Sequence, residues 1–165
     1  MSNNLSSVGV PPMQKKDAAT EAFLLVLQTA KNRLEYLTQN DWMLVLDRAK
    51  QVHFRKADTL LHAARPNKVI YIIVSGRADV QIGSKPIAHL GPGEICGEMA
   101  FLENGVASAS VVAVSEIEAY AIDWTSLSDL FELFPHLGSR FYRSLAIGLS
   151  RRLRDQILNR QLVSK

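Results

Sequence analysis

The sequence predicts an α+β domain in which helices flank a barrel or roll of about eight short strands. From residue 50 to residue 122 the apolar residues alternate with polar ones and are interrupted by regular turn signals, as in half-buried strands. On both sides the apolar spacing changes to three and four residues, which is typical of amphipathic helices. The predicted organisation is a flexible tail at 1–15, helices at 16–49, a β-roll at 50–123 and C-terminal helices at 124–165.

The first segments are assigned from polarity and helical spacing. Residues 1–15 are polar and include one glycine and two prolines, which predicts a flexible tail. Apolar residues then recur at helical spacing from Phe23 to Leu37. Thr38 or Asn40 is expected to begin a second, short helix with Trp42 in its core-facing stripe.

The strands are assigned from alternation and from β-branched runs. Val52 and Phe54 alternate with polar residues, and Val69–Val74 is a continuous apolar run that predicts a buried strand. After a glycine-rich turn, 107–114 and 117–122 are predicted as two further strands.

Two helices are expected at the C-terminal end. The first covers Asp123–Phe134, with Thr125 or Ser126 as its N-cap and Pro135 ending it. The second runs from about His136 to Arg160 with an apolar residue at every fourth position. This stripe is longer than one small roll can cover. We therefore expect its outer half to contact either the ligand pocket, as a lid, or a second copy of the helix.

Charge and cysteine content restrict the cellular setting. The formal net charge is 19 − 16 = +3, and residues 140–165 carry seven basic residues and one acidic residue. This basic helix fits an acidic partner, a membrane surface or nucleic acid, and it equally fits a solvated face. Cys96 is the one cysteine, so no internal disulfide is expected, and no apolar run approaches the ~20 residues of a membrane helix. We predict a cytoplasmic protein with no transmembrane segment.

The most informative stretch is residues 91–113. Gly91, Gly93 and Gly97 lie within seven positions, and glycine is favoured where the backbone adopts φ > 0 or approaches a ligand closely. The following residues can form a short helix with Glu98 in its first turn. The pattern indicates a backbone cradle for a small anionic ligand with a carboxylate beside it, or simply a tight turn between two strands.

The same stretch resembles the phosphate-binding cassette of cyclic-nucleotide-binding domains. These domains occur in bacterial catabolite-activator-type regulators, in regulatory subunits of cyclic-AMP-dependent protein kinase and in nucleotide-gated channels. The matching residues are Gly97, Glu98, Met99, Ala100, Ala109, Ser110, Val111 and Ala113, together with Ile70–Arg77 upstream. Val106 and Ala107 stand where the family has Pro and Arg, and Ala57 and Ala64 stand where it has Gly. Alanine tolerates positive φ poorly, which predicts that these two turns are altered.

The resemblance implies an eight-stranded antiparallel β-roll of jelly-roll type and a ligand such as cAMP, cGMP or a related phosphate compound. In it, Glu98 accepts the ribose hydroxyl. The arginine that grips the phosphate is replaced by Ala107, so a basic residue of the last helix, such as Arg151 or Arg152, is a candidate substitute. The implied ligand-binding residues are Ile95, Cys96, Gly97, Glu98, Met99, Ala100, Ala107, Ser108 and Ala109.

Two functions remain open. In the first, a regulatory module senses the ligand and signals to a protein partner through its C-terminal helices, with a homodimer through the last helix as in the bacterial regulators. In the second, a degenerate pocket binds nothing and the fold serves dimerisation or protein docking. We expect no enzyme, metal or further cofactor, because His53, His62, His89 and His136 are scattered and no catalytic motif is present. A DNA-binding domain is not expected within this sequence.

Overall fold

Two four-stranded antiparallel sheets form a β-roll between helices, which confirms the predicted fold class. The computed structural model describes residues 18–163. The predicted tail at 1–15 lies outside these residues, as do the expected helix start at Lys16 and the last two positions of the C-terminal segment. Within the described part, no helix is long and apolar enough to cross a membrane.

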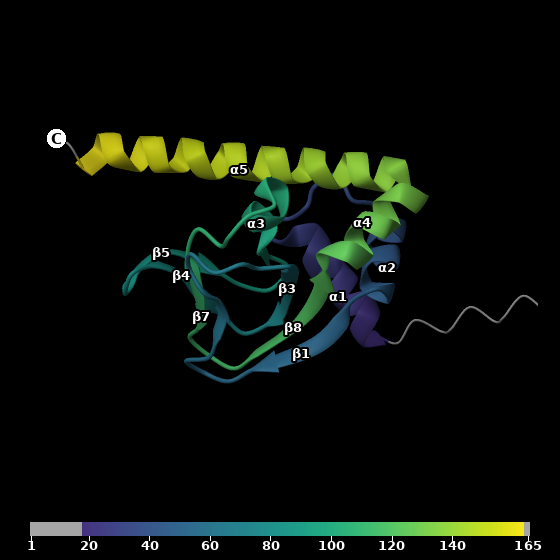
Figure 1. The fold of residues 1–165 in the computed structure, drawn as a ribbon, viewed down its shortest axis with the longest axis horizontal. Helices are drawn as coiled ribbons and strands as arrows, with labels where there is room; N and C mark the ends of the chain where they lie inside the picture. Colours follow the sequence, from purple (N-terminus) through teal and green to yellow (C-terminus); the bar gives the residue numbers. More distant parts are fainter. Residues whose placement is uncertain (1–17, 164–165) are drawn as a thin grey trace, which may run out of the picture.

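The elements follow one another as helices, strands and helices (Figure 1). The helices are α1 (Ala18–Thr29), α2 (Gln39–Asp47), α3 (Glu98–Glu103), α4 (Trp124–Leu133) and α5 (Pro135–Val163). The strands are β1 (Lys50–Phe54), β2 (Thr59–Leu61), β3 (Val69–Ser75), β4 (Ala78–Ile82), β5 (Lys85–Leu90), β6 (Ile95–Cys96), β7 (Ser110–Ala113) and β8 (Ile117–Asp123).

The strand order places sequence-distant segments side by side. One sheet has the order β1-β8-β3-β6 and the other β2-β7-β4-β5. In the first, Ile72 pairs with Tyr120 of β8 on one side and with Ile95 of β6 on the other. The short strand β6 is therefore fixed in register beside β3, and the glycine turn and α3 that follow it are held against the roll.

Side chains of β3 point to opposite faces of the strand and join two separate apolar clusters. Ile70 and Ile72 face the helices and join a cluster with α1, α2, α4 and α5, whereas Ile73 faces the interior of the roll. β3 is thus buried on both of its faces, which explains the continuous apolar run seen in the sequence. Trp42 of α2 is 1% exposed in the helix-side cluster, as its position in an apolar stripe predicted.

Helix α1 is shorter than the apolar pattern predicted. It ends at Thr29, although Leu34 and Leu37 beyond it are buried. These leucines pack from a turn-rich segment, so the three- and four-residue spacing reflected burial without helical continuity. The same segment lies against α5, because the Tyr36 backbone N–H donates to Ser144 Oγ at 2.9 Å and the Arg143 guanidinium lies 4.1 Å above the Tyr36 ring.

The junction of α4 and α5 corrects the predicted cap. Asp123, and neither Thr125 nor Ser126, is the N-cap of α4; its carboxylate accepts from the Ser126 N–H at 2.9 Å and from Ser126 Oγ at 2.7 Å. An aspartate outcompetes hydroxyl side chains here because its charge also favours the positive end of the helix. Pro135 follows the end of α4 as predicted and is itself the first residue of α5, where its missing N–H costs nothing.

An ion pair attaches α5 to α2. Arg140 donates from Nε and Nη2 to the two carboxylate oxygens of Asp41 at 2.7 and 2.6 Å. Asp41 is 3% exposed, and it also accepts from the Thr38 N–H in a capping box. Burial alone would raise the pKa of Asp41, but the hydrogen bonds from Arg140 and Thr38 outweigh it and hold the pKa below its usual value.

The turns at Ala57 and Ala64 keep the left-handed backbone, contrary to the prediction that alanine would alter them. Their φ angles are 74° and 60°. The Ala57 N–H donates to the Ala113 carbonyl of β7, and the Ala64 N–H donates to the Ala107 carbonyl in the segment before β7, both at 2.8 Å. These hydrogen bonds hold the turns in place although the conformation is unfavourable for a residue with a Cβ.

We predict that Asp41→Asn lowers the free energy of unfolding at pH 7 by about 2 kcal/mol, because it removes one partner of a buried, charge-assisted pair. The folded-state pKa of Asp41 lies below the unfolded value of about 4, so this stabilisation is present above that value and lost as the pH falls through the folded-state pKa. Denaturant unfolding from pH 7 to pH 3 measures it. The difference between the proteins should shrink in acid, and a constant difference would contradict the assignment. Asp129→Asn on an exposed face of α4 is the control.

We predict that Ala57→Gly and Ala64→Gly each stabilise the protein. Glycine removes about 1–2 kcal/mol of left-handed strain and loses about 0.4–1 kcal/mol through its more flexible unfolded chain, so a net gain of about 0.5–1 kcal/mol is expected. Thermal and denaturant unfolding measure this gain. Ala119→Gly in the middle of β8 is the opposite control and should destabilise by a similar amount. Destabilisation by all three changes would show that the two turns carry no strain.

Candidate functional site

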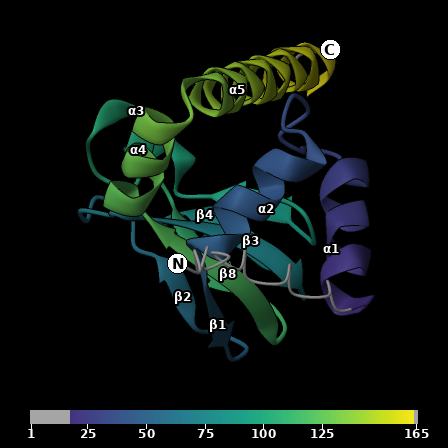
Figure 2. The same cartoon turned by 90° about the vertical axis from the view of Figure 1, so that its right-hand side faces the viewer.

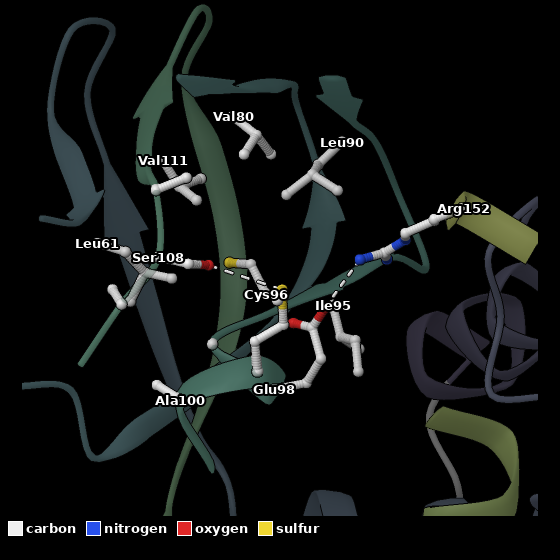
Figure 3. A pocket seen from close by; sticks show the side chains of 14 residues that line it. Leu61, Val80, Leu90, Ile95, Cys96, Glu98, Ala100, Ser108, Val111 and Arg152 are labelled. Atoms are coloured by element: carbon white, nitrogen blue, oxygen red, sulfur yellow. Dashed lines mark hydrogen bonds and ion pairs between the residues drawn. The ribbon is translucent and has the colours of Figure 1, made fainter. Parts of the chain in front are cut away.

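A pocket lies in the roll next to α3, and Arg152 of α5 forms part of its lining (Figure 3). Its walls surround about 440 Å³ of non-atom space, a volume that includes open solvent at the entrance. Its lining residues are Leu61, Val80, Leu90, Ile95, Cys96, Gly97, Glu98, Met99, Ala100, Ala107, Ser108, Ala109, Val111 and Arg152.

All nine residues proposed from the sequence line this pocket. They come from two segments, 95–100 and 107–109, which β6, α3 and the start of β7 bring together. Four lining residues were missed, namely Leu61, Val80, Leu90 and Val111. These residues are the inward-facing members of alternating strands, so period-two spacing combined with the correct strand pairing could have found them. Of the two arginines suggested from the last helix, Arg152 reaches the pocket, whereas Arg151 pairs with Glu35 at 2.8 Å.

Gly97 fixes the close approach of α3 to the roll. It adopts φ 92° as the N-cap of α3, and a Cβ at this position would lie 2.4 Å from the Val69 carbonyl oxygen. Both the conformation and the space therefore require glycine. This contact sets the first turn of α3, and with it Glu98, at the mouth of the pocket.

The charged centre of the pocket is an ion pair between α3 and α5. Arg152 Nη1 donates to Glu98 Oε1 at 2.8 Å, across 54 residues of sequence (Figure 3). The Glu98 side chain is 6% exposed and that of Arg152 is 34% exposed. Within residues 18–163 the other carboxylate oxygen, Oε2, has no hydrogen-bond donor, and it is not among the fully enclosed unpaired atoms. Glu98 thus retains an acceptor that a ligand hydroxyl can use.

Ala107 stands where the family has its phosphate-binding arginine, and it offers the pocket only backbone atoms and a methyl group. Ala107 is 5% exposed, and its N–H and carbonyl are bonded to Arg65 and Ala64. The Ser108 hydroxyl lies 3.7 Å from Met99 Sδ, a weak contact that leaves it available to a ligand. Ser110 is less available, because its Oγ accepts from the Ala63 N–H at 3.0 Å.

Cys96 forms part of the pocket wall as a small apolar residue. It is 4% exposed, and burial together with the nearby Glu98 carboxylate raises the pKa of its thiol far above the usual value, against the opposing effect of Arg152. The thiolate, which is the reactive species, is therefore suppressed. This environment favours a packing role for Cys96 over thiol redox chemistry.

Metal binding finds no support in the described residues. Across residues 18–163, no group of three or more His, Cys, Asp or Glu side chains is placed to hold a metal ion. His53 lies 3.8 Å from Glu118 and His89 lies 2.6 Å from Asp79, and none of these four residues belongs to the pocket lining. The pocket thus offers one carboxylate, one guanidinium and a hydroxyl in an apolar surrounding.

Comparison with known proteins identifies the family. The family profile described as the cyclic nucleotide-binding domain matches residues 51–133, half of the chain. Cyclic GMP-binding protein C of Dictyostelium discoideum is 30% identical over 129 residues, which are 75% of this chain and 5% of that protein. The cyclic AMP receptor protein of Thermus thermophilus is 35% identical over 105 residues, 59% of this chain and 45% of the relative. The chain therefore spans less than half the length of either curated relative.

A solved structure gives the same picture of the fold. A cyclic nucleotide-binding domain from Methylobacillus flagellatus superposes with a TM-score of 0.71 at 23% identity, covering 85% of this chain and 83% of that one. The identity is low, so this similarity concerns the β-roll and its flanking helices and not the details of the pocket.

We predict that Cys96 in the folded protein reacts with a thiol reagent such as DTNB at least about tenfold more slowly than in the unfolded chain at pH 8, because its thiol is buried and its pKa is raised. Absorbance at 412 nm follows the reaction as a function of denaturant concentration. Reaction should appear together with global unfolding measured by circular dichroism. Rapid labelling without unfolding would show that the thiol is accessible and would contradict the packing role of Cys96.

Proposed function

Because the chain belongs to the cyclic nucleotide-binding domain family, we propose that it is a regulatory module whose pocket binds a cyclic nucleotide, cAMP or cGMP, or a related phosphate ligand. Occupancy is passed to a protein partner through the C-terminal helices. The role is one of binding and not of catalysis, and its setting is the cytoplasm, in keeping with a single, unpaired cysteine.

The observation that carries this proposal is the buried Glu98 carboxylate at the mouth of an apolar pocket. A carboxylate is rarely buried without a reason, and one that keeps an unpaired oxygen at a cavity is suited to accept a hydroxyl group. The ribose of a cyclic nucleotide offers such a hydroxyl. The apolar side chains of Leu61, Val80, Leu90 and Val111 form the opposite wall, where a base can pack (Figure 3).

The arrangement of α5 supports the proposed signal route. The part of α5 up to Arg151 is anchored through Arg140, Arg143, Ser144 and Arg151, which contact α2 and the segment before it. Arg152 is the last residue of α5 that is partly buried, and every described residue after it is exposed. A ligand that changes the Glu98–Arg152 contact therefore acts where the partly buried portion of α5 ends and its exposed portion begins.

The exposed half of α5 favours a second candidate function. Leu153, Ile157, Leu158 and Leu162 are 50% exposed or more along this half. An apolar stripe that no described element covers suits a second copy of the helix or a protein partner. In this alternative the pocket is degenerate, and the chain acts as a dimerisation or docking module using its C-terminal helix.

Isothermal titration calorimetry with cAMP, cGMP and cyclic di-GMP separates the two functions. We expect cAMP or cGMP to bind with a dissociation constant in the micromolar range, about −8 kcal/mol. Glu98→Gln should weaken that binding about tenfold, because a neutral acceptor holds a hydroxyl less strongly than a carboxylate.

Glu103→Gln is the matched control, since Glu103 lies on the same helix but is exposed and outside the pocket. Millimolar or absent binding of all three nucleotides to the unmodified chain would overturn the sensor function for these ligands and leave the docking function. Equal affinity of the two variants would show that nucleotide binding does not use Glu98.

A further inference from the structure

We infer that Arg152 of α5 is the cation that binds the anionic group of the ligand, so that the anion site is completed by the C-terminal helix and not by the roll. This inference rests on the proposed binding of a cyclic nucleotide and adds the residue and the element that recognise its phosphate.

The pocket lining contains two charged side chains. Among its lining residues only Glu98 and Arg152 carry a charge, and the remaining polar side chain, the Ser108 hydroxyl, is neutral. A phosphodiester that enters this apolar space loses much of its hydration and needs a counter-charge or strong donors. Arg152 is the one cation of the lining that can provide the counter-charge.

The guanidinium of Arg152 has hydrogen-bond donors that the protein does not use within residues 18–163. Arginine has five N–H donors, and Arg152 uses Nη1 for Glu98 Oε1. Within residues 18–163 its other N–H groups donate no hydrogen bond to the protein, and the side chain is 34% exposed at the mouth of the pocket. A planar guanidinium held at one corner by a carboxylate is already oriented to receive phosphate oxygens with the rest of its fork.

The short distance between Arg152 and Glu98 restricts which ligands can contact both side chains. Arg152 and Glu98 are in direct contact at 2.8 Å, so a hydroxyl bound to Glu98 and an anion bound to Arg152 must be close neighbours in one ligand. A cyclic nucleotide meets this condition, since its 2′-hydroxyl is on the carbon next to the one that carries the cyclic phosphate. The pair therefore selects a hydroxyl adjacent to a phosphodiester.

The opposite role is also physically consistent, and it gives a different result. If the Arg152–Glu98 pair only blocks the pocket, the ligand must break it, and removing Arg152 then frees Glu98 and tightens binding. If Arg152 holds the anion, removing it weakens binding. The direction of the change in affinity decides between the two roles.

The test compares Arg152→Gln, Arg152→Lys and Arg154→Gln with the unmodified chain by calorimetric titration of cAMP and cGMP. Loss of a charged hydrogen bond is worth about 1.5–3 kcal/mol, so Arg152→Gln should weaken binding roughly 10- to 150-fold. Arg152→Lys keeps the charge without the planar fork and should fall between Gln and Arg. Arg154→Gln removes the same charge from an exposed position of the same helix and should bind like the unmodified chain. Melting temperatures verify that each variant is folded.

The outcomes separate this inference from the function on which it rests. If the unmodified chain binds neither nucleotide, both are overturned. If it binds and Arg152→Gln binds equally well or more tightly, the anion role of Arg152 alone is overturned. If Arg152→Lys and Arg152→Gln weaken nucleotide binding equally, the positive charge of Arg152 does not hold the phosphate, because lysine preserves that charge. This result would also overturn the anion role of Arg152.

Discussion

The contact between Glu98 and Arg152 is the constraint on which the account of this protein depends. It joins the short helix of the glycine-rich segment to the long C-terminal helix, two elements that are far apart in the sequence. The Glu98 carboxylate is positioned through Gly97, whose missing side chain allows the start of α3 to lie against β3. The guanidinium is positioned by the ion pairs that anchor α5 through Arg140 and Arg151. The ion pair of Glu98 and Arg152 therefore joins the pocket directly to the long C-terminal helix.

The packing of the rest of the molecule explains how such a pair can be maintained. Strand β3 contributes to two apolar clusters, one inside the roll and one between the roll and the helices. Helices α1 and α2 lie beside the roll and α5 crosses above it (Figure 2). Helix α2 is tied to α5 by the buried pair of Asp41 and Arg140, which fixes the start of α5 relative to the roll. Beyond Arg152 every described residue of α5 is exposed, and Leu153, Ile157, Leu158 and Leu162 leave apolar surface there.

Local sequence signals were sufficient for the fold and for one wall of the pocket. Three glycines in seven positions and the following short helix located the segment 95–100, and strand alternation indicated the roll. They were not sufficient where a distant residue decides the outcome. The end of α1 at Thr29 and the cap at Asp123 depend on tertiary packing and on competition between neighbouring side chains. Which arginine of α5 meets Glu98 depends on the rotation of that helix against the roll, and one position, from Arg151 to Arg152, changes its face by about 100°.

A crystal structure of the chain with cAMP would show which residues hold the ribose and the phosphate. We predict a ribose hydroxyl within hydrogen-bonding distance of the Glu98 carboxylate and phosphate oxygens within the same distance of the Arg152 guanidinium, with Arg152 still lining the pocket. A bound nucleotide whose phosphate is held elsewhere, with Arg152 turned out into solvent, would contradict this prediction.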